Sequence, residues 1–172
     1  MLSLISSHNA VFAPVAKHGS ALTPTLARIV FILVLFFYYW NSATLKTDGS
    51  IFSPSAGAFA QIFPKAAEAV LYDVTQMNIF QRLVIFLGTV AEFVLPVLLV
   101  IGLLTRFAAL GMIVFIAVQT LVDVVGHGVG LGGFLDSAQG LLDQRTMWVF
   151  LMLVLVIQGA GPLSLDRLLK LS

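Results

Sequence analysis

The chain contains no cysteine among its 172 residues. This absence excludes disulfide bonds, thiol redox chemistry, cysteine-bound zinc and iron–sulfur clusters. It also argues against a four-helix thiol-exchange enzyme, because such an enzyme needs a Cys-x-x-Cys pair.

Charge is also scarce. Charged residues make up 10% of the chain, whereas an average soluble domain has about 25%. Hydrophobic residues make up 59% and the mean hydropathy is +1.04. A water-soluble fold of this length could not bury so much apolar surface, so we expect a membrane protein in contact with the lipid bilayer. The net charge of +1 gives no basic patch for nucleic acid.

Four apolar stretches predict an all-α fold, a four-helix transmembrane bundle. Arg28 lies at the start of the first stretch, and Tyr38, Tyr39 and Trp40 cluster near its far end, as in an interfacial aromatic belt. The first stretch is just long enough to cross a hydrocarbon core of ~30 Å at ~1.5 Å per residue. The predicted spans are 26–43, 82–104, 107–125 and 146–161.

We expect two parts in the chain: an N-terminal arm, residues 1–25, and a membrane domain that contains the four spans, residues 26–172. The arm has no Lys or Arg before Lys17 and is interrupted by prolines, so we expect it to be loose or interfacial. Pro64 opens an Ala-rich stretch, which predicts a short extra helix in the first extracytoplasmic loop. We expect a glycine-rich loop over 126–145 and a short amphipathic tail after Pro162.

The distribution of Lys and Arg favours a multi-pass protein of the cytoplasmic (inner) membrane with both termini in the cytoplasm. Four spans place both termini on one side, and the side richer in Lys and Arg is the cytoplasmic one. Five of the nine basic residues share the side of the termini: Lys17, Arg28, Arg106, Arg167 and Lys170. The other four are Lys46, Lys65, Arg82 and Arg145.

Glu92 is an acidic residue inside the second span. A charged side chain near the bilayer centre is costly and is expected to face protein or water. Pro96 follows four residues later and has no N–H, so the carbonyl of Glu92 loses its usual helical partner. One interpretation is a ligand or proton site, and the other is a structural acid that holds the helices together.

A polar stripe on the third span continues this pattern. Gln119, Asp123 and His127 recur every four residues, one face of a helix. Antiparallel packing would bring Gln119 near the depth of Glu92. Either Glu92 and these three residues line a polar cavity open to the outside, or Asp123 and His127 are simply solvated at the interface. Because a metal ion would need further ligands, we predict no metal site.

The turn between the second and third spans should lie at the inner membrane surface. Thr105 can act as the N-cap of the third span. Arg106 can extend its guanidinium to anionic lipid headgroups. Gly102 precedes this turn at the end of the second span.

The chain resembles the DoxX family of small four-helix membrane proteins. The resemblance is carried by Ala91-Glu92, by the stretch Gly102-Leu-Leu-Thr-Arg-Phe-Ala-Ala-Leu110, and by the ending Gly159-Ala-Gly-Pro-Leu-Ser-Leu-Asp166. Arg28 at the start of the first span and Ala43-Thr44-Leu45-Lys46, in place of a Gly-x-x-Lys pattern, add to it.

The family takes its name from a subunit of thiosulfate:quinone oxidoreductase, so the resemblance implies a cytoplasmic-membrane protein beside redox protein partners. We expect a membrane subunit or anchor of a redox system, with quinone as the candidate ligand near Glu92, Gln119, Tyr38 and Tyr39. The alternative is a non-enzymatic binding, transport or scaffold protein for lipid or another apolar solute. Both alternatives are compatible with a homo-oligomer. No catalytic motif is recognisable, so the sequence leaves open whether the protein is an enzyme; an enzymatic role would be that of an oxidoreductase-associated subunit.

Overall fold

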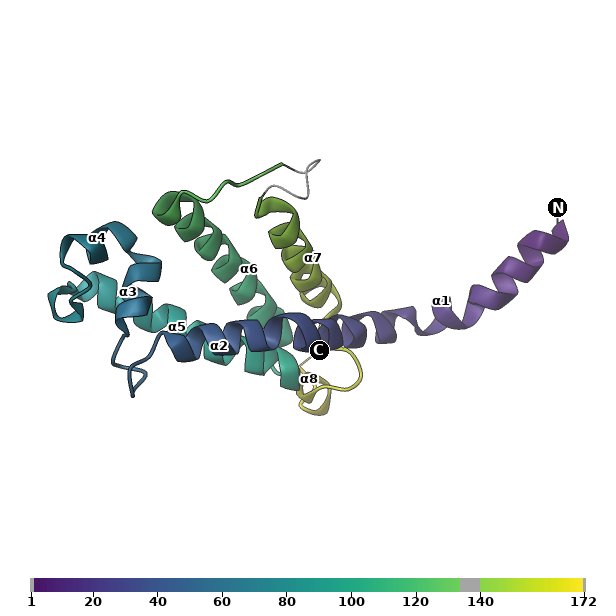
Figure 1. Ribbon diagram of the computed structural model, residues 1–172. Helices are drawn as coiled ribbons and strands as arrows, with labels where there is room; N and C mark the ends of the chain where they lie inside the picture. The colour runs from purple at the N-terminus through teal and green to yellow at the C-terminus, as the bar shows by residue number, and fades with distance from the viewer. Residues whose placement is uncertain (1, 134–139, 172) are drawn as a thin grey trace.

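The computed structural model describes residues 2–133 and 140–171, and in this part of the chain every regular element is helical. Figure 1 shows long helices crossing one another, with short helices at the end away from the N-terminus. The elements are α1 (Leu2–Phe31), η1 (Ile32–Phe36), α2 (Phe37–Leu45), α3 (Ala56–Ile62), α4 (Pro64–Ala69), η2 (Val74–Gln76), α5 (Ile79–Ile101), α6 (Thr105–Leu121), η3 (Val122–Gly126), α7 (Leu142–Gln158) and α8 (Leu165–Leu168).

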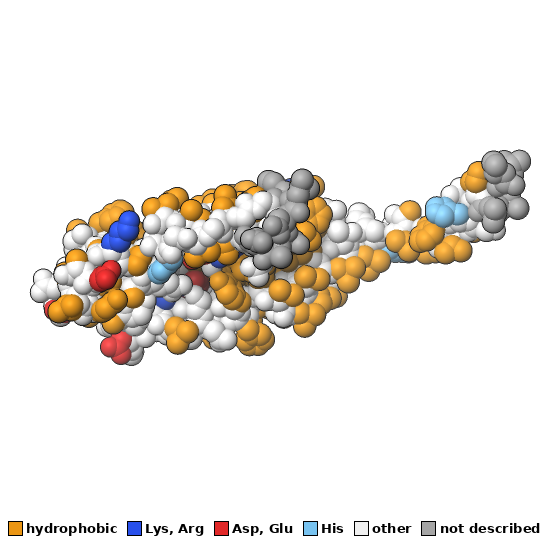
Figure 2. Space-filling model, turned by 45° about the horizontal axis from the view of Figure 1, so that its top comes forward, with side chains coloured by type: hydrophobic (Ala, Val, Ile, Leu, Met, Phe, Trp, Pro, Cys, Tyr) orange, Lys and Arg blue, Asp and Glu red, His pale blue; other side chains and the backbone are white. Residues whose placement is uncertain are grey.

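Three helical segments are long and apolar enough to cross a membrane: Ile5–Leu45, Ile79–Ile101 and Thr105–Gly126. The protein is therefore a helical membrane protein with three candidate spans. The fourth predicted span corresponds to α7, which has 17 residues and packs against α6 and α1. Figure 2 shows hydrophobic side chains over much of the visible face, as expected for a surface in contact with lipid.

The N-terminal arm, expected to be loose or interfacial, is helical: residues 2–31 form one helix that continues through η1 and α2. Pro14 and Pro24 both lie inside α1. A proline removes one helical hydrogen bond, and these two are ten residues apart, so the helical stretches between and around them remain intact. The N-terminal part of α1 projects away from the other helices (Figure 1).

The main apolar core lies between α1, α2, α5, α6 and α7. Its fully buried members include Phe31, Tyr39, Leu99, Met112 and Met152. Helices α5 and α6 approach closely, since a Cβ atom added at Gly111 would lie 3.0 Å from a methyl group of Leu95. A small residue at such a crossing lets two membrane helices pack closely.

The connection between α2 and α5 forms a second, smaller core at the end of α5. Its buried residues are Ala58, Phe59, Ala67, Met77 and Ile85. The short helix predicted at Pro64 is present as α4, with the proline in its first turn. Helix α3 precedes it and was not predicted, although Ser55 caps it by accepting a hydrogen bond from the amide of Ala58.

Helix α5 starts three residues earlier than predicted. Asn78 and Gln81 form a capping box in which each side chain accepts a hydrogen bond from the backbone of the other. The C-cap of α5 is Gly102, whose backbone is in the left-handed region with φ of 68°. The turn from Gly102 to Leu104 then leads directly into α6, so the predicted helix–turn–helix hairpin is present.

Arg28 connects α1 to the C-terminal ends of two other helices. Its guanidinium donates hydrogen bonds to the carbonyls of Leu99 and Val100 at the end of α5, and to those of Ala160 and Leu163 after α7. The last carbonyls of a helix have no intrahelical partner and favour a cation. Arg28 is only 8% exposed, so it acts as a buried cap and not as a surface charge.

The N-terminus of α6 is capped differently from the prediction. Thr105 is the first residue of α6, and its side chain makes no capping hydrogen bond. Instead, the carboxylate of Asp166 accepts hydrogen bonds from the backbone amides of Leu104 and Thr105, at 2.6 and 2.9 Å. A carboxylate at this position neutralises unpaired N–H groups and the positive end of the helix dipole. The expectation that Thr105 caps this helix was wrong, because the cap comes from the C-terminal segment.

Candidate functional site: a buried ion pair beside a small cavity

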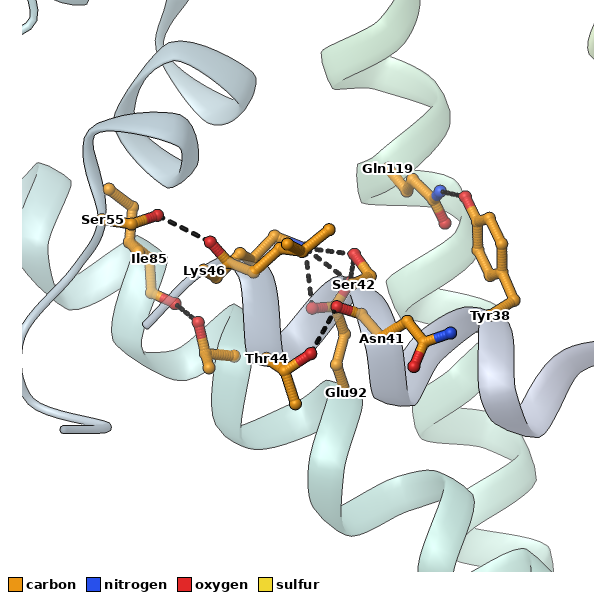
Figure 3. Close-up of polar contacts among 11 residues, drawn as sticks. Tyr38, Asn41, Ser42, Thr44, Lys46, Ser55, Ile85, Glu92 and Gln119 are labelled. Carbon is orange, nitrogen blue, oxygen red and sulfur yellow. Dashed lines mark hydrogen bonds and ion pairs between the residues drawn. The ribbon is translucent and has the colours of Figure 1, made fainter. Parts of the chain in front are cut away.

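Glu92 forms a buried ion pair with Lys46. The Lys46 ammonium donates to both carboxylate oxygens, with Nζ 2.6 Å from Oε1 and 2.7 Å from Oε2. Ser42 completes the group, since its hydroxyl donates to Glu92 Oε1 at 3.0 Å and accepts from Lys46 Nζ at 2.8 Å. Figure 3 shows these three side chains meeting between α2 and α5.

Local structure positions the lysine. Ser42 and Lys46 are four residues apart, so they occupy one face of the same helix. Lys46 is the C-cap of α2, and its carbonyl accepts a hydrogen bond from the backbone amide of Ser55. Ser55 also donates through its hydroxyl to the carbonyl of Leu45 at 2.8 Å. These two bonds close the loop after α2 and fix the backbone from which the lysine extends.

The side chains of Lys46 and Glu92 are 5% and 3% exposed. Burying both charges costs solvation free energy, which the pair offsets by mutual attraction and by the bonds through Ser42. On α5, Thr89 donates to the carbonyl of Ile85 and is not part of the pair. Pro96 is buried one turn beyond Glu92, so the carbonyl of Glu92 lacks a helical donor.

A small cavity lies next to the ion pair, with a volume of about 70 Å³. A cavity needs about 10–15 Å³ of such volume to hold a water molecule, so this cavity has room for water. Its polar lining consists of Lys46, Gln61, Glu92, Gln119 and Asp123, and its apolar lining consists of Ile62, Val84, Gly88, Phe115, Val118 and Val122. The structure therefore brings three of the four predicted site residues to one cavity, together with Lys46.

The two polar atoms of the Gln119 side chain have different surroundings. Its amide nitrogen donates to the hydroxyl oxygen of Tyr38 at 2.6 Å, which links α6 to α2. Its carbonyl oxygen is buried without a hydrogen-bond partner among the residues that the structure describes. Because a buried polar atom is normally paired, this oxygen is suited to accept a hydrogen bond from a bound molecule or a water.

Asp123 forms a second ion pair, with Arg145. Asp123 lies in the π-helical turn η3, and Arg145 lies in the first turn of α7. The Nη2 to Oδ2 distance is 2.7 Å, and the arginine lies over the ring of Trp148 at 4.8 Å. Sequence reasoning counted Arg145 only as a loop charge. The signal that could have found it was its position just before the apolar run that forms α7.

The remaining predicted residues lie around this region. His127 is exposed, its Nε2 is 2.7 Å from the carbonyl oxygen of Gln61, and it does not line the cavity. Tyr39 is fully buried among Phe115 and Trp148, and its hydroxyl has no partner within residues 2–133 and 140–171. In the same ranges no group of three or more His, Asp or Glu side chains has the arrangement of a metal site.

A wider groove lies on the surface beside the ion pair, with a volume of about 350 Å³. It is lined by Tyr38, Asn41, Ser42, Leu45 and Gln61. Ser42 faces this groove and also hydrogen-bonds Glu92, while Gln61 lines both the groove and the small cavity. Only the Ser42 side chain therefore separates the Lys46–Glu92 pair from this groove, which is large enough for an organic ring.

No family model matches the chain, and no solved structure matches it. A protein of Haemophilus influenzae described as uncharacterized is 34% identical over 84 residues. The alignment covers 46% of this chain and 49% of that protein, so the match spans about half the length of each.

Proposed function

We propose that this protein is a multi-pass cytoplasmic-membrane protein that binds a quinone headgroup beside the Lys46–Glu92 pair, as a subunit or anchor of a redox system. The observation that carries the proposal is the position of this buried pair between the small cavity and the surface groove. The motif residues shared with the DoxX family support the same proposal.

The groove offers the chemistry that a quinone ring requires. A quinone carbonyl accepts hydrogen bonds, and the hydroxyl of Tyr38 is able to donate one because its oxygen already accepts from Gln119. Asn41 and Gln61 provide further amide donors, and Leu45 provides an apolar wall. The neighbouring α2 residues Phe37 and Trp40 are exposed to the surface, where an isoprenoid tail would lie among lipids.

The buried Lys46–Glu92 pair is placed to take part in proton transfer to a bound quinone. Reduction of a quinone to a quinol adds two electrons and two protons to the ring oxygens. Ser42 connects the groove to Glu92 through a 3.0 Å hydrogen bond, and the small cavity on the other side has room for water. In this proposal the electrons come from a redox partner protein.

The membrane arrangement in this proposal has four crossings, with α7 as the fourth and both termini in the cytoplasm. The 17 residues of α7 span about 26 Å at 1.5 Å per residue, close to the ~30 Å thickness of a hydrocarbon core. The basic residues Arg106, Arg167 and Lys170 lie at the end formed by the α5–α6 turn and α8. The positive-inside rule assigns this end to the cytoplasm.

Quinone binding can be tested on the detergent-purified protein with a short-tail ubiquinone as the probe. We expect the wild type to bind it and Asn41→Leu to bind it several-fold more weakly, because Asn41 lines the groove. Thr44→Ala changes an exposed residue on the same helix that does not line the groove, so it serves as the matched control. Equal binding by all three proteins would contradict the proposal.

The second candidate is a non-enzymatic protein that binds or transports a lipid or another apolar solute, or acts as a scaffold. The observation in its favour is a second groove of about 310 Å³ with a largely apolar lining, which includes Ile62, Phe63, Leu121, Val122 and Val125. Native mass spectrometry of the purified protein separates the candidates. A copurified quinone supports the first, and a copurified lipid without quinone supports the second.

A further inference from the structure

A separate cavity lies at the N-terminus of α6, with a volume of about 150 Å³. Thr105 and Gln119 are 14 residues apart on this helix, so the cavity is about 21 Å along α6 from the quinone site proposed above. Its lining includes Thr105, Arg106, Phe107, Gly159, Asp166 and Leu171. Thr105, Gly159 and Asp166 are buried and form its floor, while Arg106, Phe107 and Leu171 are exposed and form its rim.

We propose that this cavity binds the phosphate group of an anionic phospholipid. The buried hydroxyl of Thr105 gives the first indication. Thr105 is 0% exposed, and its Oγ1 has no hydrogen-bond partner in the part of the chain that the structure describes. A buried hydroxyl without a partner costs free energy. A phosphate oxygen in the cavity would accept its hydrogen bond.

Arg106 provides the charge. Within the described residues it forms no ion pair, and its side chain crosses over Gly159, where an added Cβ would lie 3.5 Å from Nε. Arginine forms charge-assisted hydrogen bonds with phosphate oxygens through its fork of N–H groups. In the proposed complex, the guanidinium binds the phosphate from the rim and the Thr105 hydroxyl binds it from the floor.

The acidic residue in the floor does not prevent this. Both carboxylate oxygens of Asp166 accept backbone hydrogen bonds, from Leu104 and Thr105. Its charge is offset by the end of the helix dipole and by Arg28, which is near enough for a Coulombic interaction. Arg167 and Lys170, on and after α8, are exposed at the same end of the helices and do not line the cavity.

The surroundings favour a lipid over free phosphate as the source of the anion. Phe107 and Leu168 are 75% and 76% exposed, and Leu104 and Leu171 lie at the rim. Such exposed apolar side chains suit contact with acyl chains, and basic pockets between membrane helices bind anionic headgroups. The same end of the helices thus presents a phosphate-binding cavity and an apolar border.

The test is native mass spectrometry of the full chain in dodecyl maltoside with dioctanoyl-phosphatidylglycerol as the probe. We expect a one-lipid adduct, and about tenfold weaker binding for Arg106→Gln and for Thr105→Val, as for the loss of one charge-assisted hydrogen bond. Thr105→Ser keeps the hydroxyl and should bind as the wild type does. Melting temperatures near that of the wild type show that the variants are folded.

Arg167→Gln is the matched control, because it removes an equal charge from the same end without lining the cavity. It should keep the adduct. An equal loss of binding in Arg167→Gln and Arg106→Gln would overturn the proposal, since it would indicate general attraction to a basic surface. Dioctanoyl-phosphatidylcholine should bind weakly, and millimolar inorganic phosphate should not displace phosphatidylglycerol. Complete displacement by inorganic phosphate would overturn the assignment to a lipid.

Discussion

Lys46 and Glu92 are 46 positions apart in the chain, and the Lys46 ammonium lies 2.6 Å from Glu92 Oε1 in an environment almost without solvent. This pair connects the end of α2 to the middle of α5. Because the Glu92 carboxylate stabilises the buried Lys46 ammonium, replacing Glu92 by a neutral residue should affect the stability of the fold.

Glu92→Gln should therefore destabilise the protein. From the sequence we would expect a nearly neutral change, since glutamine keeps the shape of glutamate. In the structure, the substitution would leave the Lys46 ammonium buried without a counter-charge, which costs about 3–5 kcal/mol. Lys46→Met should cost a similar amount, and the double variant Lys46→Met/Glu92→Gln should cost clearly less than the sum of the two.

Thermal unfolding in detergent measures these differences, with Glu68→Gln as a control because Glu68 is exposed on α4. Additive losses in the double variant would show that the two charges do not stabilise each other. Wild-type stability of Glu92→Gln would show that the pair is not buried as described.

The sequence predicts the parts of the fold that depend on local pattern. Apolar runs gave the three candidate spans, and Gly102 marked the turn between α5 and α6. It does not predict partners distant in the chain. Helical periodicity shows which face a residue occupies, but the Lys46–Glu92 and Asp123–Arg145 pairs depend on how helices pack. The cap of α6 by Asp166 was missed for the same reason.

Gly102→Ala should be strongly destabilising compared with an alanine at another glycine of the chain. Gly102 has φ of 68°, and a Cβ atom there would lie 2.6 Å from Cβ of Ser164 and 2.9 Å from Cζ of Arg28. The strained backbone alone costs of order 1 kcal/mol or more, and the clash displaces the arginine that caps α5. Gly19→Ala is the control, because Gly19 lies in α1 with no atom within 4 Å of the added Cβ. A melting temperature for Gly102→Ala equal to that of Gly19→Ala would contradict this account.

The proposed topology predicts which sites react with a thiol reagent that does not cross the membrane. The chain has no cysteine, so single cysteines can be introduced at exposed positions. Ser53→Cys, in the loop between α2 and α3, should be labelled from outside intact cells, and Leu169→Cys, after α8, should be labelled only after permeabilisation. Labelling with the opposite pattern would place the C-terminus outside. Labelling of both positions in intact cells would require an even number of crossings between them, in place of the three proposed.

Asp123→Asn should destabilise the protein through Arg145. The side chain of Arg145 is 8% exposed, and its guanidinium has Asp123 as its carboxylate partner at 2.7 Å. Without that charge it keeps the contact with Trp148 at 4.8 Å, a cation–π interaction worth about 0.5–2 kcal/mol. Because the Asp123 side chain is 25% exposed, water screens part of the effect, and we expect a smaller loss than for Glu92→Gln.

A double variant distinguishes the effect of an unpaired Arg145 charge from a general packing defect. Asp123→Asn/Arg145→Met removes the buried cation and leaves an apolar side chain against Trp148, so it should recover part of the stability lost in Asp123→Asn. Asp48→Asn, at an exposed loop position, controls for removal of a negative charge. The measurement is the melting temperature in detergent for all three proteins. If the double variant is less stable than Asp123→Asn alone, Arg145 stabilises α7 by its own contacts, and the ion pair is not the reason that these two residues meet beside the cavity.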